Sequence, residues 1–270
     1  MRRLTLALTA SLFLLSVSRA EKPKTAGGRW TVEDVVHSES ATDFQVSPDG
    51  RRAVWVKTTA DADKGEHVAQ LVRTDLEGGP EVVLTRGGDS CTQPRWSPDG
   101  KLLAFLSARA APGAKAGEDK DKAQIWLLNP TGGEPWPLTE SARAVLHYAW
   151  AGPDALVFVA QEEATLRETT LKDEKKDTTV VVEDERHEPP ARLFKVAVES
   201  KKVTRLTDNR DRIESLAVSP DGKRAVTTHS RSLRYTFDNK VKPVVLLTDL
   251  EGGDRKQIFA GPKLNISRVR

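Results

Sequence analysis

The tetrapeptide Ser-Pro-Asp-Gly occurs three times in this 270-residue chain, at 47–50, 97–100 and 219–222. Proline presets φ at the first corner of a tight turn, aspartate accepts bonds from nearby backbone, and glycine adopts positive φ at low cost. Each copy lies between two short runs in which β-branched, aliphatic or aromatic residues alternate with polar ones, a pattern typical of β-strands. The repeat therefore predicts three hairpins built on the same turn.

A second predicted hairpin follows each of these, and Thr-Asp-Leu-Glu-Gly-Gly recurs at 74–79 and 248–253. One further unit is divergent, with Ala151-Gly152-Pro153-Asp154 in place of the tetrapeptide. The four turns begin at 47, 97, 151 and 219, so their spacings are 50, 54 and 68 residues. A four-stranded unit that repeats about every 40–50 residues is typical of a β-propeller blade. We therefore expect an all-β fold, a β-propeller of four-stranded blades. Packed β-sandwich hairpins, which need no identical turns, are the alternative.

The predicted blades differ in length mainly between their second and third strands. The insertions are 58–67, 109–122, 161–190 and 230–242. In an up-and-down blade this connection always emerges on the same face, so the insertions are expected to gather at one mouth of the propeller. Such a face is often a binding face. Solvated charged loops are the other interpretation of each insertion.

The first twenty residues have the composition of a secretory signal peptide. Two arginines precede an apolar run at 4–17, and Ser18-Arg19-Ala20 places small residues where a signal peptidase reads them. The apolar run is too short to span a bilayer comfortably, which disfavours a membrane anchor. We therefore predict cleavage after Ala20, a periplasmic or secreted protein, and no membrane association after cleavage.

Removal of this segment changes the charge of the chain. It contains three arginines and no acid, so the 42 basic residues fall to 39, against 39 acidic ones. A neutral mature chain lacks the electrostatic basis for nucleic-acid binding, and no nucleic-acid partner is expected. With one cysteine, Cys91, the chain has no internal disulfide.

The last residues of the chain, 264–270, match in length and pattern the strands that precede the turns. We therefore expect a fifth blade to begin there, so that the propeller is incomplete and the chain is the N-terminal part of a longer protein. The predicted organisation is a signal peptide at 1–20, a lead-in with a short helix at 21–42, and a propeller at 43–270.

The lead-in and two later segments resemble a known family. "RWTVEDVVHSESATDFQVSPDGRRAVWV" (29–56), "LFKVAVESKKVTRLTD" (193–208) and "KKDTTVVVEDERHEPPARLF" (175–194) are similar to the N-terminal propeller of secreted prolyl oligopeptidase family (S9) serine peptidases. The dipeptidyl-peptidase and acylaminoacyl-peptidase group is the most similar. The Ser-Pro-Asp-Gly repeats are less specific, because TolB-like and WD40-like propellers share this kind of repeat.

The resemblance implies a function that depends on a second domain. In this family the propeller caps an α/β-hydrolase domain, which carries a Ser–Asp–His triad and cleaves short peptides, and the propeller controls access. These 270 residues contain no G-x-S-x-G elbow, so no catalytic residue is assigned to them. The expected function is therefore the non-catalytic, gating portion of a peptidase, with peptide substrates and a C-terminal hydrolase domain as partners. The alternative is a periplasmic TolB-like propeller that binds other proteins as a scaffold.

Few side chains in the sequence have a pattern that points to chemistry. By the same resemblance, Glu162 and Glu163 are candidates to bind the free amine of a peptide through charge-assisted hydrogen bonds; an ordinary acidic loop pair is the competing interpretation. The five histidines show no ligand spacing, so no metal is expected, and no cofactor either. Cys91 has no basic neighbour in the sequence and is predicted to be a buried, inactive thiol.

Overall fold

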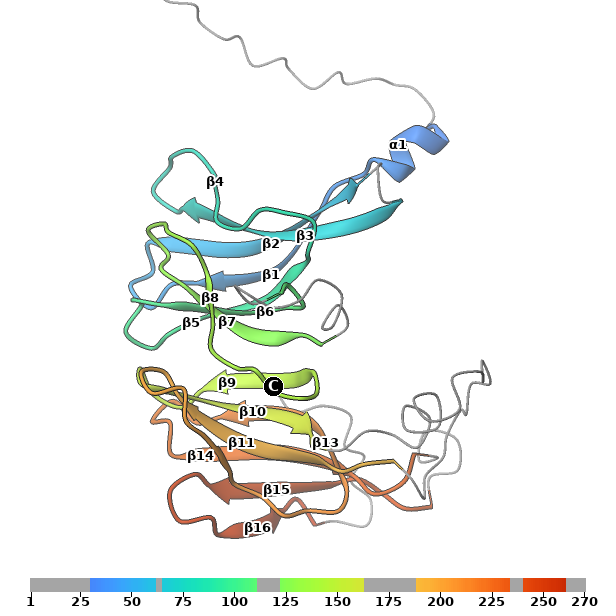
Figure 1. Cartoon of the computed structure of the whole chain (residues 1–270), viewed down its shortest axis with the longest axis vertical. Helices are drawn as coiled ribbons and strands as arrows, with labels where there is room; N and C mark the ends of the chain where they lie inside the picture. The colour runs from blue at the N-terminus through green and yellow to red at the C-terminus, as the bar shows by residue number, and fades with distance from the viewer. Residues whose placement is uncertain (1–29, 62–64, 111–121, 163–187, 234–239, 261–270) are drawn as a thin grey trace, which may run out of the picture. The chain divides into compact units, whose positions relative to one another are not determined.

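The computed structural model describes residues 30–61, 65–110, 122–162, 188–233 and 240–260 (Figure 1). The chain divides into two units, residues 1–36 and 37–270. The predicted signal peptide, the expected start of a fifth blade and Glu163 lie outside the described residues.

The described part of the first unit contains one short helix, α1 (Val32–Val36). The Thr31 backbone N–H and hydroxyl both donate to the Asp34 carboxylate, at 2.9 and 2.7 Å. The Thr31 hydroxyl in turn accepts the Asp34 backbone N–H at 3.1 Å. This reciprocal arrangement satisfies backbone donors at the helix start, as a capping box does.

The described part of the second unit is built from β-strands (Figure 1). Their bounds are β1 (Ser40–Val46), β2 (Arg52–Asp61), β3 (Glu66–Asp75), β4 (Val82–Val83), β5 (Cys91–Trp96), β6 (Leu103–Ser107), β7 (Gln124–Leu128), β8 (Trp136–Pro137), β9 (Val145–Trp150), β10 (Ala155–Gln161), β11 (Ala191–Ala197), β12 (Val203–Arg205), β13 (Arg212–Val218), β14 (Arg224–Ser230), β15 (Val244–Asp249) and β16 (Arg255–Ile258).

The strands pair into four antiparallel groups of four in chain order. Group 1 is β1–β4 and group 2 is β5–β8, each a separate sheet. Group 3 (β9–β12) and group 4 (β13–β16) share one eight-stranded sheet. The pair that joins groups 3 and 4 is the parallel bridge between Ala191 and Arg212. Within each group every strand pairs with its neighbour in sequence, as in consecutive hairpins.

Each Ser-Pro-Asp-Gly stretch lies between the first and second strands of its group and makes the same hydrogen bonds. The serine hydroxyl donates to the aspartate at 2.5, 2.7 and 2.5 Å, and the glycine N–H donates to the serine carbonyl at 2.9, 2.9 and 2.8 Å. The serine bond lowers the pKa of each aspartate, Asp49, Asp99 and Asp221. The glycines have φ of 71°, 71° and 70°, so the turn requires glycine at its end.

The turns of neighbouring groups lie against one another. A Cβ placed on Gly222 would come within 2.8 Å of the Ala151 carbonyl carbon in the turn of group 3. Tryptophans at the ends of two first strands add links between groups: Trp96 Nε1 donates to the Gln45 carbonyl at 3.1 Å, and Trp150 Nε1 donates to the Arg95 carbonyl at 3.0 Å. Adjacent groups are therefore joined by specific polar contacts as well as by packing.

The core consists of apolar clusters between successive groups. Leu71 of group 1 packs with Phe105 of group 2, and both are fully buried. Between groups 2 and 3 the cluster includes the stacked rings of Phe158 and Phe194, whose centroids are 5.2 Å apart. A third cluster includes Ile213 and lies between groups 3 and 4. Burial of such faces between sheets supplies the main driving force for folding.

One predicted insertion is mostly strand. The ladder between β2 and β3 continues to the pair Asp61–Glu66, so most of the segment 58–67 extends the hairpin rather than forming a loop. The insertion therefore lengthens the hairpin, because backbone pairing can continue through polar residues when the two strands already lie in register. Among the described residues, no helix is long and apolar enough to cross a membrane.

Candidate functional site

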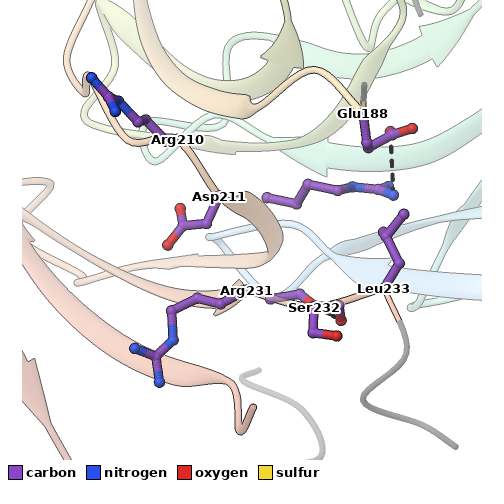
Figure 2. Close-up of a pocket in the computed structure, with 8 residues that line it drawn as sticks. Glu188, Arg210, Asp211, Arg231, Ser232 and Leu233 are labelled. Carbon is purple, nitrogen blue, oxygen red and sulfur yellow. Dashed lines mark hydrogen bonds and ion pairs between the residues drawn. The ribbon is translucent and has the colours of Figure 1, made fainter. Parts of the chain in front are cut away.

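A pocket of about 310 Å³ lies where β11 and β13 begin and β14 ends (Figure 2). These strand ends adjoin the connections β10–β11 and β14–β15, where the sequence predicts insertions. The lining residues are Glu188, Arg210, Asp211, Arg212, Ser230, Arg231, Ser232 and Leu233. Five of these eight residues carry an ionisable side chain, so charge dominates the chemistry of the pocket.

Asp211 is bound to a buried histidine. The His229 ring is 1% exposed, and its Nδ1 lies 2.7 Å from Asp211 Oδ1. Asn209 Nδ2 also donates to Asp211 Oδ1, at 2.9 Å. Burial raises the pKa of Asp211, but the bond and charge of His229 and the bond from Asn209 outweigh it and hold the pKa below its usual value. The Asp211 carboxylate is therefore ionised and already engaged.

The other ring nitrogen of His229 contacts a hydroxyl: Nε2 lies 2.9 Å from Thr227 Oγ1. Carboxylate, imidazole and hydroxyl in this order also make up nucleophilic triads. Thr227 is 1% exposed, however, so a substrate has no access to its hydroxyl. The three side chains act here as a buried polar link between the start of β13 and β14.

The second acid of the pocket is engaged as well. Glu188 Oε1 accepts a hydrogen bond from Gln161 Nε2 at 2.8 Å and lies 3.3 Å from Arg212 Nη1. Figure 2 shows this ion pair as a dashed line. Arg212 Nε lies 3.7 Å from Glu214 as well, so this arginine is held between two carboxylates.

The other two arginines of the pocket differ from Arg212. Arg231 Nη2 donates to the Lys242 carbonyl at 3.2 Å, a neutral acceptor. Within the part of the chain that the structure describes, neither Arg210 nor Arg231 forms an ion pair with a carboxylate. In Figure 2 the two side chains diverge, on either side of Asp211. Of the three pocket arginines, Arg212 is therefore the one that carboxylates of the described residues hold in place.

The predicted site residue Glu162 lies elsewhere, at the end of β10. It borders a second pocket, of about 270 Å³, whose apolar lining includes Phe158, Phe194 and Val203. Its carboxylate is paired with Arg192 and lies 3.3 Å from Arg205 Nη1. A peptide ammonium that bound there would share the carboxylate with these two arginines. Amine binding by Glu162 stays a prediction.

A recurring polar arrangement at the outer strands was missed by the sequence analysis. In group 1 the Thr85 hydroxyl accepts the Leu71 N–H at 2.9 Å and donates to Gln70 Oε1 at 2.7 Å. In group 2 Thr139 makes the corresponding bonds to Ile125 and Gln124, both at 2.9 Å. The signal in the sequence is a Leu-Thr pair at 84–85, 138–139 and 206–207, each near the end of a predicted blade.

The prediction for Cys91 is confirmed in one respect and wrong in another. The thiol is fully buried. Arg109, which follows β6, nevertheless brings Nη2 to 3.2 Å from Cys91 Sγ, and its guanidinium lies over the Trp126 ring at 5.3 Å from the centroid. The basic neighbour is distant in sequence, so the local sequence could not reveal it. Among the described residues, no group of three or more His, Cys, Asp or Glu side chains is placed to bind a metal.

One curated relative matches over most of the chain. Over 205 residues the chain is 32% identical to the Bacillus subtilis (strain 168) protein named "Uncharacterized peptidase YuxL". The match covers 72% of this chain and 30% of that protein, so the chain spans less than a third of its relative's length. No family model matches the chain.

Solved structures of peptidases share the fold. Pyrococcus horikoshii acylaminoacyl peptidase matches with a TM-score of 0.57 and 16% identity, over 82% of this chain and 33% of that one. The β-propeller domain of the Trilobed protease from Pyrococcus furiosus matches with a TM-score of 0.52 and 17% identity, over 82% of this chain and 57% of that one. At these identities the likeness shows the fold alone. The chain is thus a homologue of a curated peptidase and folds like the propeller portion of prolyl oligopeptidase and acylaminoacyl peptidase enzymes, as its sequence predicts.

Proposed function

We propose that this chain is the non-catalytic propeller portion of an exported serine peptidase, and that its four strand groups are successive blades. The observation that carries the proposal is the 32% identity, over 205 residues, to a curated peptidase of more than three times the matched length. The 270 residues contain no G-x-S-x-G elbow. The proposal therefore assigns hydrolysis to a C-terminal α/β-hydrolase domain outside them.

The propeller portion acts in this proposal as a gate that admits short peptides and excludes longer or folded chains. Two features of the molecule support this role. The long connections β6–β7, β10–β11 and β14–β15 join corresponding strands of three groups, and corresponding connections of repeated units lie on one face. The charged pocket is at the strand ends next to two of these connections, where a passing peptide would contact it.

Export is part of the same proposal. The arginines, the apolar run and Ser18-Arg19-Ala20 at the start of the chain support a cleaved signal peptide and a periplasmic or secreted enzyme. N-terminal sequencing of the protein recovered from outside the cytoplasm tests it. A mature chain that begins at Glu21 is expected, and an uncleaved Met1 contradicts it.

The most economical test of the function is the reading frame downstream of the codon for Arg270. The proposal expects further Ser-Pro-Asp-Gly units, then a G-x-S-x-G elbow, then an aspartate and a histidine. A frame that closes the propeller with no hydrolase after it contradicts the peptidase function. In that event a TolB-like protein-binding scaffold takes its place.

The amine-binding role predicted for Glu162 has its own test in the full-length enzyme. If Glu162 binds the free amine, Glu162→Gln raises KM for peptides with a free N-terminus and leaves KM unchanged for the same peptides N-acetylated. An equal effect on both substrates assigns Glu162 to its pairing with Arg192 and Arg205 instead.

A further inference from the structure

The second pocket, at the junction of groups 2 and 3, is built on a pair of aromatic rings. Phe158 of β10 and Phe194 of β11 are partners in the sheet register, their rings are stacked, and both border the cavity. Glu140, on the connection between β8 and β9, and Glu162, which follows β10, border it as well. The described residues that line this pocket thus include two acids and no basic side chain.

The corresponding aromatic pair of group 2 has an arginine over it. By strand register, Phe105 and Trp126 correspond to the two phenylalanines of the pocket. Arg109 follows Phe105 by four residues, as Glu162 follows the phenylalanine of its own pair. The Arg109 guanidinium carbon lies 5.8 Å from the centroid of the Phe105 ring and 5.3 Å from that of Trp126. In group 2 the protein therefore supplies its own cation to the aromatic pair.

A second matching position differs in the same way between the two junctions. Thr85 and Thr139 make corresponding hydrogen bonds in groups 1 and 2. The residue after each threonine is Arg86 at the junction of groups 1 and 2, and Glu140 at the junction of groups 2 and 3. With Arg109 matched by a glutamate too, both positions change from a base to an acid. The junction that has the pocket thus has the charge that complements a cation.

We propose that this pocket binds the guanidinium group of an arginine side chain of a peptide, in the place that Arg109 takes in group 2. Aromatic rings attract a cation through their quadrupole, and arginine takes such positions more often than lysine. The cavity of about 270 Å³ is larger than the ~150 Å³ apolar cavity that accepts benzene, so a planar guanidinium and part of its stem fit. That the ligand is a peptide rests on the proposed function; that its bound group is a guanidinium rests on the rings, the two acids and the comparison with group 2.

The two acids contribute unequally to this binding. Glu162 already pairs with Arg192 and lies 3.3 Å from Arg205 Nη1. A carboxylate has about four lone-pair sites, so a bound guanidinium shares Glu162 with these arginines. Glu140 is exposed and adds a second negative charge at the pocket. We therefore expect Glu140 to contribute at least as much to affinity as Glu162.

Four fluorescent alanine tetrapeptide amides identify the bound group. Three are N-acetylated and contain one arginine, one citrulline, which is the neutral analogue of arginine, or one leucine; the fourth has alanines alone and a free N-terminal amine. Anisotropy titrations use the full-length protein at low salt, with a serine-peptidase inhibitor present to prevent hydrolysis. The arginine peptide is expected to bind about tenfold more tightly than the citrulline peptide. Added salt weakens this binding, since the acids are partly exposed.

Substitutions test each part of the pocket with the arginine peptide. Glu140→Gln is expected to weaken binding about threefold to tenfold. Phe194→Leu should weaken it about threefold, whereas Phe194→Trp, which introduces the residue that group 2 has as Trp126, should retain it. Glu199→Gln is the matched control, because Glu199 is an exposed acid beyond the other end of β11 and should leave binding unchanged. Thermal melting of each variant shows whether the fold is retained.

Several outcomes overturn the inference. Equal affinity for the arginine and citrulline peptides does so, as does tighter binding of the leucine peptide, which would make the site an apolar pocket. Unchanged affinity in Glu140→Gln also rejects it, and this exposed position does not depend on the core. Binding of the free-amine peptide without binding of the arginine peptide assigns the acids to a peptide N-terminus instead.

The site and the proposed function fail separately. If no peptide binds to a protein that hydrolyses peptides when the inhibitor is left out, the guanidinium site is rejected and the proposed function stands. If the arginine peptide binds in the predicted way to a protein without any peptidase activity, the site is supported and the peptidase function is rejected.

Discussion

In groups 1 and 2 a glutamine on the third strand and a threonine after the fourth strand hydrogen-bond to each other, whereas groups 3 and 4 each depart from this arrangement. In group 1 Gln70 links Thr85 to the backbone carbonyl of Gly87, and in group 2 Gln124 links Thr139 to the carbonyls of Ser141 and Arg143. The glutamine lies on the third strand in both groups. Each network therefore ties the third strand to the backbone of the connection that leads to the next group.

In group 3 the carboxamide has moved off the strand. Arg192 stands where the glutamine would be and pairs with Glu162, while Thr207 donates instead to Asn209 Oδ1 at 2.7 Å. Asn209 lies on the connection to group 4, and its amide reaches Asp211 there. From Asp211 the link continues to His229 of β14, so in group 3 the side-chain network extends into the next group and supports the charged pocket.

Group 4 has neither the glutamine nor the threonine. By strand register, Val244 and Phe259 stand at the positions of the glutamine and threonine, and Phe259 is 65% exposed. Groups 1, 2 and 4 thus share their turn chemistry, whereas only groups 1 and 2 share the outer polar network. The charged pocket lies at the junction of groups 3 and 4, where the repeat departs most from this arrangement.

The largest expected effect comes from breaking the link that crosses this junction. Asp211→Ala leaves the buried His229 ring and the Asn209 amide without their shared acceptor, and should lower the free energy of unfolding by about 2–4 kcal/mol. Urea unfolding followed by tryptophan fluorescence measures it. Asp208→Ala is the control, because that exposed carboxylate pairs with Arg255 at the surface and its removal should not change the unfolding curve. Equal effects of the two substitutions would mean that the link does not stabilise the junction.

A second comparison concerns two glycines with the same backbone conformation. Gly222 has φ of 70° and Gly50 has φ of 71°, but a Cβ meets the Ala151 backbone at 2.8 Å in the first case and nothing within 4 Å in the second. Gly50→Ala should cost about 1–2 kcal/mol from backbone strain alone. Gly222→Ala should cost at least about 1 kcal/mol more, because the turn of group 3 must shift. Thermal unfolding of both variants checks this, and identical melting temperatures would contradict the close approach of the two turns.

The threonine arrangement gives a smaller effect. Thr139→Val removes the acceptor of the buried Ile125 N–H and should cost about 1–2 kcal/mol. Thr85→Val should cost about the same, since its bonds have the same lengths within a few tenths of an ångström. Phe259→Thr in group 4 should be nearly neutral, because no glutamine faces that position. A loss in group 1 but not in group 2 would show that the two networks are not equivalent.

The smallest predicted effect is a pH dependence of the same junction. The pKa of Asp211 lies below its ordinary value near 3.8 in the folded protein, so ionised Asp211 stabilises the fold above that value. This contribution is lost as the pH falls through the lower folded pKa. Unfolding free energies measured from roughly pH 5 to pH 2 should therefore fall more steeply for the native protein than for Asp211→Asn. Parallel curves would contradict the assignment.

Much of the fold follows from local chemistry and could be predicted. The Ser-Pro-Asp-Gly turns combine three residues whose backbone preferences agree, and the flanking alternation agrees with paired strands, so position and pairing follow from a short window. The extension of β2 to Asp61 could not be predicted, because the residues at the end of this strand are mostly polar. Their pairing with β3 depends on the register that the earlier, apolar part of the two strands sets.

The site was much less predictable. Asp211 and His229 are separated by 18 residues, and Arg210 and Arg231 by a whole hairpin, so only the folded sheet brings them to one pocket. Glu162 was chosen from an acidic pair by resemblance, and the sequence could not reveal that Arg192 and Arg205 converge on it. Charges gathered by pairing of distant strands leave no local pattern.

Whether this propeller portion gates a peptidase, as we propose, is best measured by the length dependence of hydrolysis in the full-length protein. We would measure kcat/KM for a series of N-acetylated peptides that share one cleavage site and grow longer on both sides. A propeller that acts as a gate predicts hydrolysis of the short peptides and a steep fall in kcat/KM as length increases. Hydrolysis that is independent of length would contradict the gate, and the absence of hydrolysis for every peptide would contradict the peptidase itself.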